Sequence, residues 1–168
     1  MIFNQTAIVD NRTITTFLPI DEVTTDGVEL VLNRAVLGDK LDLRFNTTFA
    51  DATITRNRTN PAIEGKVFPR MPKWRANLLA TYHISARWDI GGGIRYASDS
   101  FGDLDNADVA HGVFGAMDGY TQVNVRSGFA LNDKMRLSFG VDNLTDQIAF
   151  VHHPWPGRTA FAEASVSF

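Results

Sequence analysis

The stretch Lys134-Met135-Arg136-Leu137-Ser138-Phe139-Gly140-Val141-Asp142 decides the fold. Apolar residues at the odd positions 135–141 alternate without a break with polar or small residues at the even positions 136–142. This period of two predicts a β-strand with two unlike faces. The pattern returns at the end of the chain, where Ala162, Ala164, Val166 and Phe168 oppose Glu163, Ser165 and Ser167. Such a strand fits lipid on one side and a wet lumen on the other.

Alternation of this kind recurs along the chain and predicts eight strands. They are expected at residues 1–9, 28–33, 41–56, 73–84, 87–96, 119–131, 134–142 and 162–168. The polar, threonine-rich residues 10–25 are predicted to form a loop. Short turns follow Asn33, Ile84 and Leu131, whereas long connections follow Val9, Arg56, Ser98 and Thr145. Strict alternation of short and long connections, with Trp and Tyr near strand ends, is typical of a transmembrane β-barrel.

Four stretches carry a resemblance to a known family. They are Gly27-Val28-Glu29-Leu30, Met71-Pro72-Lys73-Trp74, Val141-Asp142-Asn143-Leu144-Thr145-Asp146, and Pro156-Gly157-Arg158-Thr159 running on to the terminal Phe168. The last two resemble the carboxyl-terminal signature of TonB-dependent outer-membrane receptors, and the first two resemble other patterns of the same family. The resemblance implies an all-β, antiparallel transmembrane barrel of twenty-two strands, of which residues 1–168 would be the carboxyl-terminal part.

The resemblance also implies a function and partners. The expected activity is uptake of a scarce nutrient, most often a ferric siderophore or other metal chelate, across the outer membrane of a Gram-negative bacterium. Energy would come through TonB, a plug domain would sit inside the barrel, and neither the plug nor the TonB-contacting segment is recognised in this chain. The barrel-assembly machinery would read the last strand, through Ala164, Val166 and Phe168. No cofactor and no enzymatic activity are expected.

Arginines recur on the polar faces of the predicted strands. They are Arg44, Arg75, Arg95, Arg126 and Arg136, and with Glu163 they are predicted to face the lumen. A soluble sandwich could not bury five unpaired arginines cheaply. Two interpretations remain open: the arginines form a lining that passes an anionic solute, or, the favoured interpretation, they pair across strands and against the plug. The cross-strand candidates are Asp42, Asp89, Asp142 and Glu163.

Composition excludes several classes of protein. No apolar run approaches the roughly eighteen residues that a spanning helix needs. A net charge of −3 without basic clusters argues against nucleic-acid binding. The absence of cysteine excludes disulfides and thiolate metal sites. No P-loop, His-Glu-x-x-His or Gly-x-Ser-x-Gly motif is present. The first residues lack a signal-peptide pattern, so outer-membrane localisation requires a signal peptide in the full-length protein.

The most concentrated chemistry lies in His152-His153-Pro154-Trp155-Pro156-Gly157-Arg158. His152, His153, Trp155 and Arg158 are candidates for contact with a ligand in an extracellular loop, although a simple Pro- and Gly-shaped loop is the favoured interpretation. Adjacent side chains in an extended segment point apart, which argues against shared metal binding by the two histidines. Asp103, Asp105 and Asp108 loosely suggest Ca²⁺, but they lack the central Gly and closing Glu of an EF-hand loop.

Two rival folds also fit part of the pattern. A small, stand-alone eight-stranded outer-membrane barrel, used for adhesion or as an anchor, could close on a filled interior. A soluble β-sandwich or lipocalin-like barrel is the other, but it would expose a large apolar belt.

Overall fold

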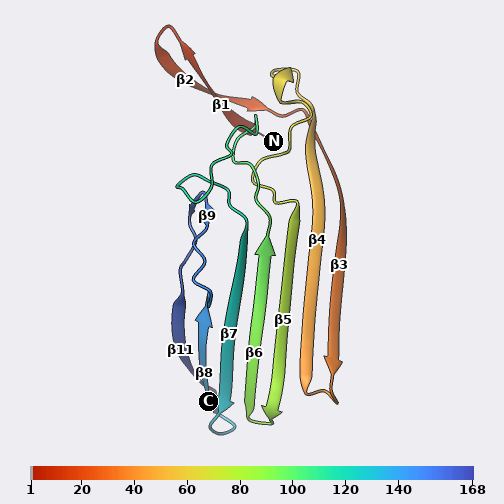
Figure 1. Cartoon of the computed structure of the whole chain (residues 1–168), viewed down its shortest axis with the longest axis vertical. Coiled ribbons are helices and arrows are strands. Elements are labelled where there is room, and N and C mark those ends of the chain that lie inside the picture. The colour runs from red at the N-terminus through yellow and green to blue at the C-terminus, as the bar shows by residue number, and fades with distance from the viewer. Residues whose placement is uncertain (1) are drawn as a thin grey trace.

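The computed structural model describes the backbone of residues 2–168 and the side chains of residues 10–12, 14 and 19–168. Within these residues, seven strands form one antiparallel sheet (Figure 1). The strands are β3 (Glu22–Val36), β4 (Leu41–Arg56), β5 (Trp74–Ser85), β6 (Trp88–Ala97), β7 (Tyr120–Ala130), β8 (Met135–Asp142) and β11 (Thr159–Val166). Strands that are neighbours in sequence are neighbours in the sheet, so the predicted antiparallel β fold is confirmed.

The amino-terminal segment differs from the prediction. Residues 10–25 are not a loop, because β2 (Arg12–Pro19) pairs with β1 (Ile2–Val9) in a separate hairpin and β3 already begins at Glu22. The turn of this hairpin is Asp10-Asn11, and both residues have left-handed backbone angles, with φ of 50° and 59°. Asp and Asn tolerate this conformation, which a two-residue hairpin turn requires. The main sheet therefore has seven strands in its described part, and the strand predicted at residues 1–9 belongs to the separate hairpin.

The connections separate by length onto the two ends of the sheet. Turns 37–40, 86–87 and 131–134 lie at one end, and the long connections 57–73, 98–119 and 143–158 lie at the other (Figure 1). The predicted separation of short and long connections is confirmed for these six, whereas the predicted long connection after Val9 is a two-residue turn. A short 3-10 helix, η1 (Pro61–Ile63), lies in the first long connection, and a small hairpin of β9 (Phe150–Val151) and β10 (His153–Pro154) lies in the last. No helix in the described residues is long and apolar enough to cross a membrane.

The strand register separates two faces of the sheet. Directly opposed residues of antiparallel strands share a face. The pairs that follow place the predicted inward residues on one face: Arg44 with Leu79, Arg75 with Thr48, Arg95 with Asn77, Arg126 with Gly91, Arg136 with Ala130, and Glu163 with Ser138. We call this the polar face. That the polar face lines a lumen remains a prediction.

The opposite, apolar face carries large side chains that remain in contact with solvent. Leu30, Leu78, Ile90, Ile94, Phe129 and Phe139 are between 39% and 55% exposed. Trp74 and Trp88 begin β5 and β6, and Tyr96 lies next to the end of β6, as expected of aromatic girdles. An apolar belt of this size is avoided by soluble monomers and fits contact with lipid.

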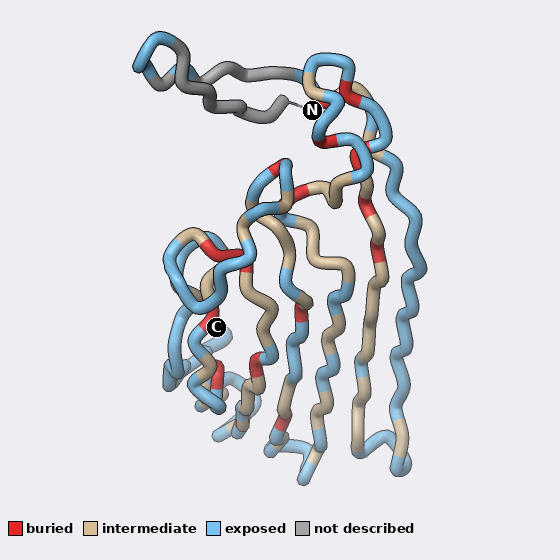
Figure 2. Tube along the Cα trace, turned by 45° about the horizontal axis from the view of Figure 1, so that its top comes forward, coloured by how far each residue is buried: buried red, intermediate tan, exposed pale blue. Residues whose placement is uncertain are grey.

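Burial is concentrated beneath the long connections. A cluster of Ile20, Ile54, Ile63 and Leu104 forms there, whereas the strands are mostly exposed or half-buried (Figure 2). In the described residues no second sheet packs on the first, and the edge strands β3 and β11 do not pair with each other. The architecture is therefore neither a soluble sandwich nor a closed eight-stranded barrel.

Gly140 offers a sharp test of packing on the polar face. A methyl group there would meet the Phe161 ring of β11 and lie 2.8 Å from the Val125 carbonyl oxygen of β7. We expect Gly140→Ala to lower the free energy of unfolding by about 1–3 kcal/mol. The measurement is the midpoint of thermal unfolding in detergent, made on the longest protein that the gene encodes.

Gly92→Ala is the matched control for Gly140→Ala. Its added methyl would lie 3.6 Å from the Asn124 carbonyl oxygen, an ordinary contact, so a change within about 0.5 kcal/mol is expected. Equal midpoints for the two variants would contradict the packing described at Gly140.

Candidate functional site

The three long connections are hydrogen-bonded into one structure, here called the loop cap (residues 57–73, 98–119 and 143–158). The Arg70 N–H donates to the Phe101 carbonyl oxygen at 2.6 Å and joins the first connection to the second. The second and third are joined where the Gly115 N–H donates to the His152 carbonyl oxygen at 2.9 Å. The His152 N–H returns a bond to the Ala116 carbonyl oxygen at 2.8 Å. The cap is therefore a single connected surface at one end of the sheet.

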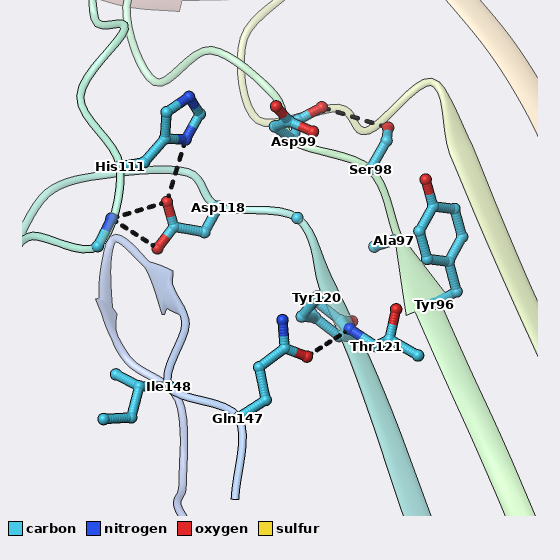
Figure 3. A pocket seen from close by; sticks show the side chains of 12 residues that line it. Tyr96, Ala97, Ser98, Asp99, His111, Asp118, Tyr120, Thr121, Gln147 and Ile148 are labelled. Atoms are coloured by element: carbon cyan, nitrogen blue, oxygen red, sulfur yellow. Dashed lines mark hydrogen bonds and ion pairs between the residues drawn. The ribbon is translucent and has the colours of Figure 1, made fainter. Parts of the chain in front are cut away.

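Asp118 is the centre of the cap. Its carboxylate accepts hydrogen bonds from the Gly112 N–H at 3.1 Å and the Phe150 N–H at 2.9 Å. It also contacts His111 Nδ1 at 3.3 Å (Figure 3). Phe150 belongs to the third connection, so one carboxylate fixes two loops. The Asp118 side chain is only 10% exposed, which strengthens these charge-assisted bonds.

A pocket of about 430 Å³ opens beside Asp118, and we call it the cap pocket. Its lining includes Tyr96, Asp99, His111, Tyr120, Gln147 and Ile148, contributed by the ends of β6 and β7 and by two loops (Figure 3). The Gln147 side chain is held by the Thr121 N–H, which donates to Oε1 at 2.7 Å. Hydroxyl, imidazole, carboxylate and amide groups thus converge on one concave space.

A second hollow of about 440 Å³ adjoins the cap pocket. The two share Ser98, Asp99 and His111, and the second is lined also by Met71, Trp74, Phe101 and Val109. Apolar surface next to a few convergent polar groups is the usual make-up of a small-molecule site. The loop cap therefore offers a site for a small molecule with polar and apolar parts.

Asn143 fixes the last connection from within. It is 2% exposed and has a left-handed φ of 51°, which Asn tolerates better than other non-glycine residues. Its Nδ2 donates to the carbonyl oxygens of Gln147 at 3.0 Å and Pro156 at 3.2 Å, and its Oδ1 accepts from the Gln147 N–H at 3.0 Å. Its own N–H donates to Asn124 Oδ1 at 2.8 Å. Asn143 therefore ties both ends of the connection to β7.

The predicted ligand-contact residues do not meet at one point. His152 and His153 are exposed and lie with Phe114, whose ring centroid is 5.0 Å from that of His153. The Trp155 ring stacks on Tyr120 of the cap pocket, with centroids 5.2 Å apart. Arg158 pairs instead with Asp146, which accepts from the Arg158 main-chain N–H at 2.8 Å and lies 3.5 Å from its guanidinium group. Ligand contact by His152, His153, Trp155 and Arg158 stays a prediction.

The expectation that the two histidines point apart is wrong. Their ring centroids are 4.8 Å apart, because His152 has a left-handed φ of 67° and bends the chain. Within the described residues, no group of three or more His, Asp or Glu side chains could hold a metal ion.

The acidic residues Asp103, Asp105 and Asp108 lie in the second long connection, where two of them accept hydrogen bonds from the backbone of the loop. Asp108 accepts from the N–H groups of Gly102 and Asp103, and Asp105 accepts from the Ala107 N–H at 3.2 Å. Burial, together with the nearby carboxylates of Asp108 and Asp105, raises the pKa of Asp103 above its usual value. The side chains of Asp105 and Asp108 therefore stabilise the loop through backbone hydrogen bonds, and in the described part of the chain the three carboxylates form no group that could hold a metal ion.

Cross-strand pairing on the polar face holds for one of the five predicted arginines. Arg136 forms an ion pair with Asp89, and Asp42 pairs with His83 at 2.9 Å. Among the described side chains, no ion pair is formed by Arg44, Arg75, Arg95 or Arg126.

The predicted assembly signal lies at one edge of the sheet. Ala164 and Val166 are on β11, opposite Leu137 and Met135 on the apolar face. The strand predicted at residues 162–168 runs instead from Thr159 to Val166, so Phe168 lies two residues beyond its end and is fully exposed. Recognition of these three residues by assembly machinery stays a prediction.

Sequence reasoning missed Asp118, His111 and Gln147. No motif marks them, because each acts through contacts between loops that lie far apart along the chain. Asn143 lies within the stretch of residues 141–146 that resembles the family. Its burial and its hydrogen bonds could not be predicted, because they depend on the folded loop.

Replacing Asp118 should loosen the cap. Asp118→Ala removes the acceptor that holds Gly112 and Phe150. We therefore expect chymotrypsin to nick the chain at exposed Phe114 roughly tenfold faster. Asp105→Ala, in the same loop but accepting only from Ala107, is the control and should leave the rate unchanged. Equal rates for both variants would show that Asp118 does not organise the cap.

The chain is similar to known proteins in both sequence and fold. A family model described as "TonB dependent receptor-like, beta-barrel" matches residues 1–144. Similar solved structures include the siderophore receptor PiuA from Acinetobacter baumannii, with a TM-score of 0.70 and 24% identity over 84% of this chain and 21% of that protein. The ferric citrate transporter FecA, in its unliganded form, is similar with a TM-score of 0.74 and 20% identity. That match covers 87% of this chain and 24% of FecA.

The copper transporter OprC is also similar, with a TM-score of 0.75 and 19% identity over 100% of this chain and 27% of that protein. At these identities the likeness establishes the fold. The chain spans about a quarter of the length of each of these three proteins.

Proposed function

The chain belongs to the family of TonB-dependent receptors, and we propose from this that it forms the carboxyl-terminal part of the barrel of an outer-membrane transporter for a metal chelate. The chain is a receptor barrel similar in fold to siderophore and metal receptors. The proposed whole protein has a twenty-two-stranded barrel in a Gram-negative outer membrane, a plug domain and energy supplied through TonB.

The observation that carries the substrate class is the cap pocket with its apolar neighbour. The polar groups of His111 and Gln147 suit the oxygen-rich periphery of a metal chelate, and Phe101 and Val109 of the neighbouring hollow suit the apolar backbone of such a ligand. PiuA, FecA and OprC are named for a siderophore, ferric citrate and copper, which supports a metal-containing cargo. Trp155, His152, His153 and Arg158 would border the entrance.

The other parts of the chain have matching roles in this proposal. The apolar face would contact lipid, and the polar face would line the lumen against the plug. The barrel-assembly machinery would read β11 through Ala164, Val166 and Phe168.

Transport by intact cells tests the proposal. A strain lacking the gene is supplied under metal limitation with radioactive ferric citrate, ferric catecholate or copper. Uptake of one of these should fall to background and return when the gene is restored. Unchanged uptake of all three would contradict the proposed function.

Within that assay, His111→Ala tests the cap pocket. Loss of the imidazole from the pocket wall should raise the half-saturating concentration of the transported chelate by about tenfold. Asp105→Ala, in the same loop and outside the pocket, should transport like the unaltered protein. A His111→Ala variant with an unchanged half-saturating concentration would place the ligand elsewhere.

A further inference from the structure

A separate hollow of about 330 Å³ lies on the polar face. Its floor is the glycine run Gly91–Gly93 of β6, and Arg44, Arg95 and Arg126 are among its lining residues. Arg126 extends over the floor, since a methyl group added at Gly91 would lie 3.7 Å from its Cγ atom. The missing side chains of the glycines leave the space open. This hollow, here called the basic hollow, is distinct from the loop cap.

No carboxylate lines the basic hollow, and the three guanidinium groups form no ion pair with any described side chain. Two carboxylates of the same face have partners of their own. Asp42 pairs with His83 at 2.9 Å, and Asp89 pairs with Arg136. Three like charges around one space repel one another, and this repulsion is relieved when an anion enters.

The amide groups of the hollow also present donors. Asn124 Oδ1 already accepts the Asn143 N–H at 2.8 Å, which leaves the Asn124 NH₂ group free to donate. Asn46 Oδ1 accepts from Asn77 Nδ2 at 2.9 Å, which leaves the Asn46 NH₂ group free in the same way. Of the three side-chain amide oxygens of the hollow, only that of Asn77 accepts no hydrogen bond from the described residues. Charged and neutral donors therefore outnumber acceptors in the hollow, as in sites that bind oxyanions.

We propose that the basic hollow binds an oxyanion, a carboxylate or a phosphate, through Arg44, Arg95 and Arg126. Planar guanidinium groups match the two oxygens of either anion. The oxyanion has two sources: a carboxylate side chain from another part of the longer protein, or a small anion free in solution. The two sources have the same chemistry and are separated by experiment.

Arginine labelling tests this on the unaltered protein. The longest protein that the gene encodes, purified in detergent, is treated with hydroxyphenylglyoxal, and labelling is followed by mass spectrometry. Arg75 is the internal reference, because it is exposed on the same face and lies outside the hollow. The three hollow arginines should react about tenfold more slowly than Arg75 when an oxyanion holds them.

Labelling with and without added inorganic phosphate distinguishes a free anion from a carboxylate side chain of the longer protein. Protection that appears only with added inorganic phosphate identifies a free anion. Protection without added phosphate indicates a carboxylate of the protein, provided that an Arg126→Lys variant is cross-linked to a carboxylate by carbodiimide. Protection without such a cross-link would mean steric cover and would overturn the proposal. Labelling as fast as that of Arg75, with and without phosphate, would also overturn it.

Discussion

The 168-residue chain, produced alone and transferred into detergent micelles, is expected to yield no heat-modifiable monomer. The sheet ends on two open edges, β3 of 15 residues and β11 of 8 residues. Roughly half of the backbone N–H and C=O groups of an antiparallel edge strand point away from the sheet. Each unsatisfied group costs several kcal/mol in hydrocarbon, so the total of tens of kcal/mol exceeds the 5–15 kcal/mol that usually stabilises a domain.

Electrophoresis of boiled and unboiled samples, with circular dichroism, measures this outcome. Aggregates or ladders of multimers are expected from the chain alone, because open edges pair with other copies. The control is the longest protein that the gene encodes, which should give a compact, heat-modifiable band. A monodisperse monomer from the 168 residues alone would mean that β3 and β11 pair with each other in detergent.

Replacement of Asn143 is expected to have the largest effect of any single substitution in the loop cap. Asn143→Ala removes the side chain that bonds to Gln147 and Pro156 and leaves their groups without partners. It also puts Ala at a left-handed φ of 51°. Lost bonds, unsatisfied groups and backbone strain together should lower the free energy of unfolding by about 3 kcal/mol. Thermal unfolding of the longest encoded protein in detergent is the measurement.

Asn132→Ala provides the matched control for Asn143→Ala. Its side chain also accepts backbone hydrogen bonds, from Lys134 and Met135 at 2.9 Å, but it lies exposed in a turn at the opposite end of the sheet. Water replaces those bonds, so a loss of at most about 1 kcal/mol is expected. Similar losses for the two variants would show that burial of Asn143 contributes little.

Alternation along single strands was enough to predict most of the sheet. Strand β4 was predicted at its observed bounds, and the six residues predicted to face inward do share one face of the sheet, because side-chain direction in a strand depends only on position. The Asp10-Asn11 turn was missed because its left-handed angles are rare outside glycine and carry only a weak sequence signal. This one turn changed the assignment of residues 10–25.

The candidate site was predicted less well, for a physical reason. The loop cap depends on bonds such as Phe150 N–H to Asp118, which join residues 32 positions apart. Nothing in the local sequence selects that partner. His152 and His153 form a motif that is visible in the sequence. Asp118, which organises the cap, has no distinctive neighbours in the sequence.

The bond from the Asn143 N–H to Asn124 Oδ1 joins the loop cap to the basic hollow. Asn143 holds the last connection of the loop cap, and Asn124 lines the basic hollow. A ligand that displaces this connection must either break that bond or rotate the Asn124 amide with it. In the proposed transporter, a ligand held by the loop cap would therefore act on the basic hollow through this one hydrogen bond.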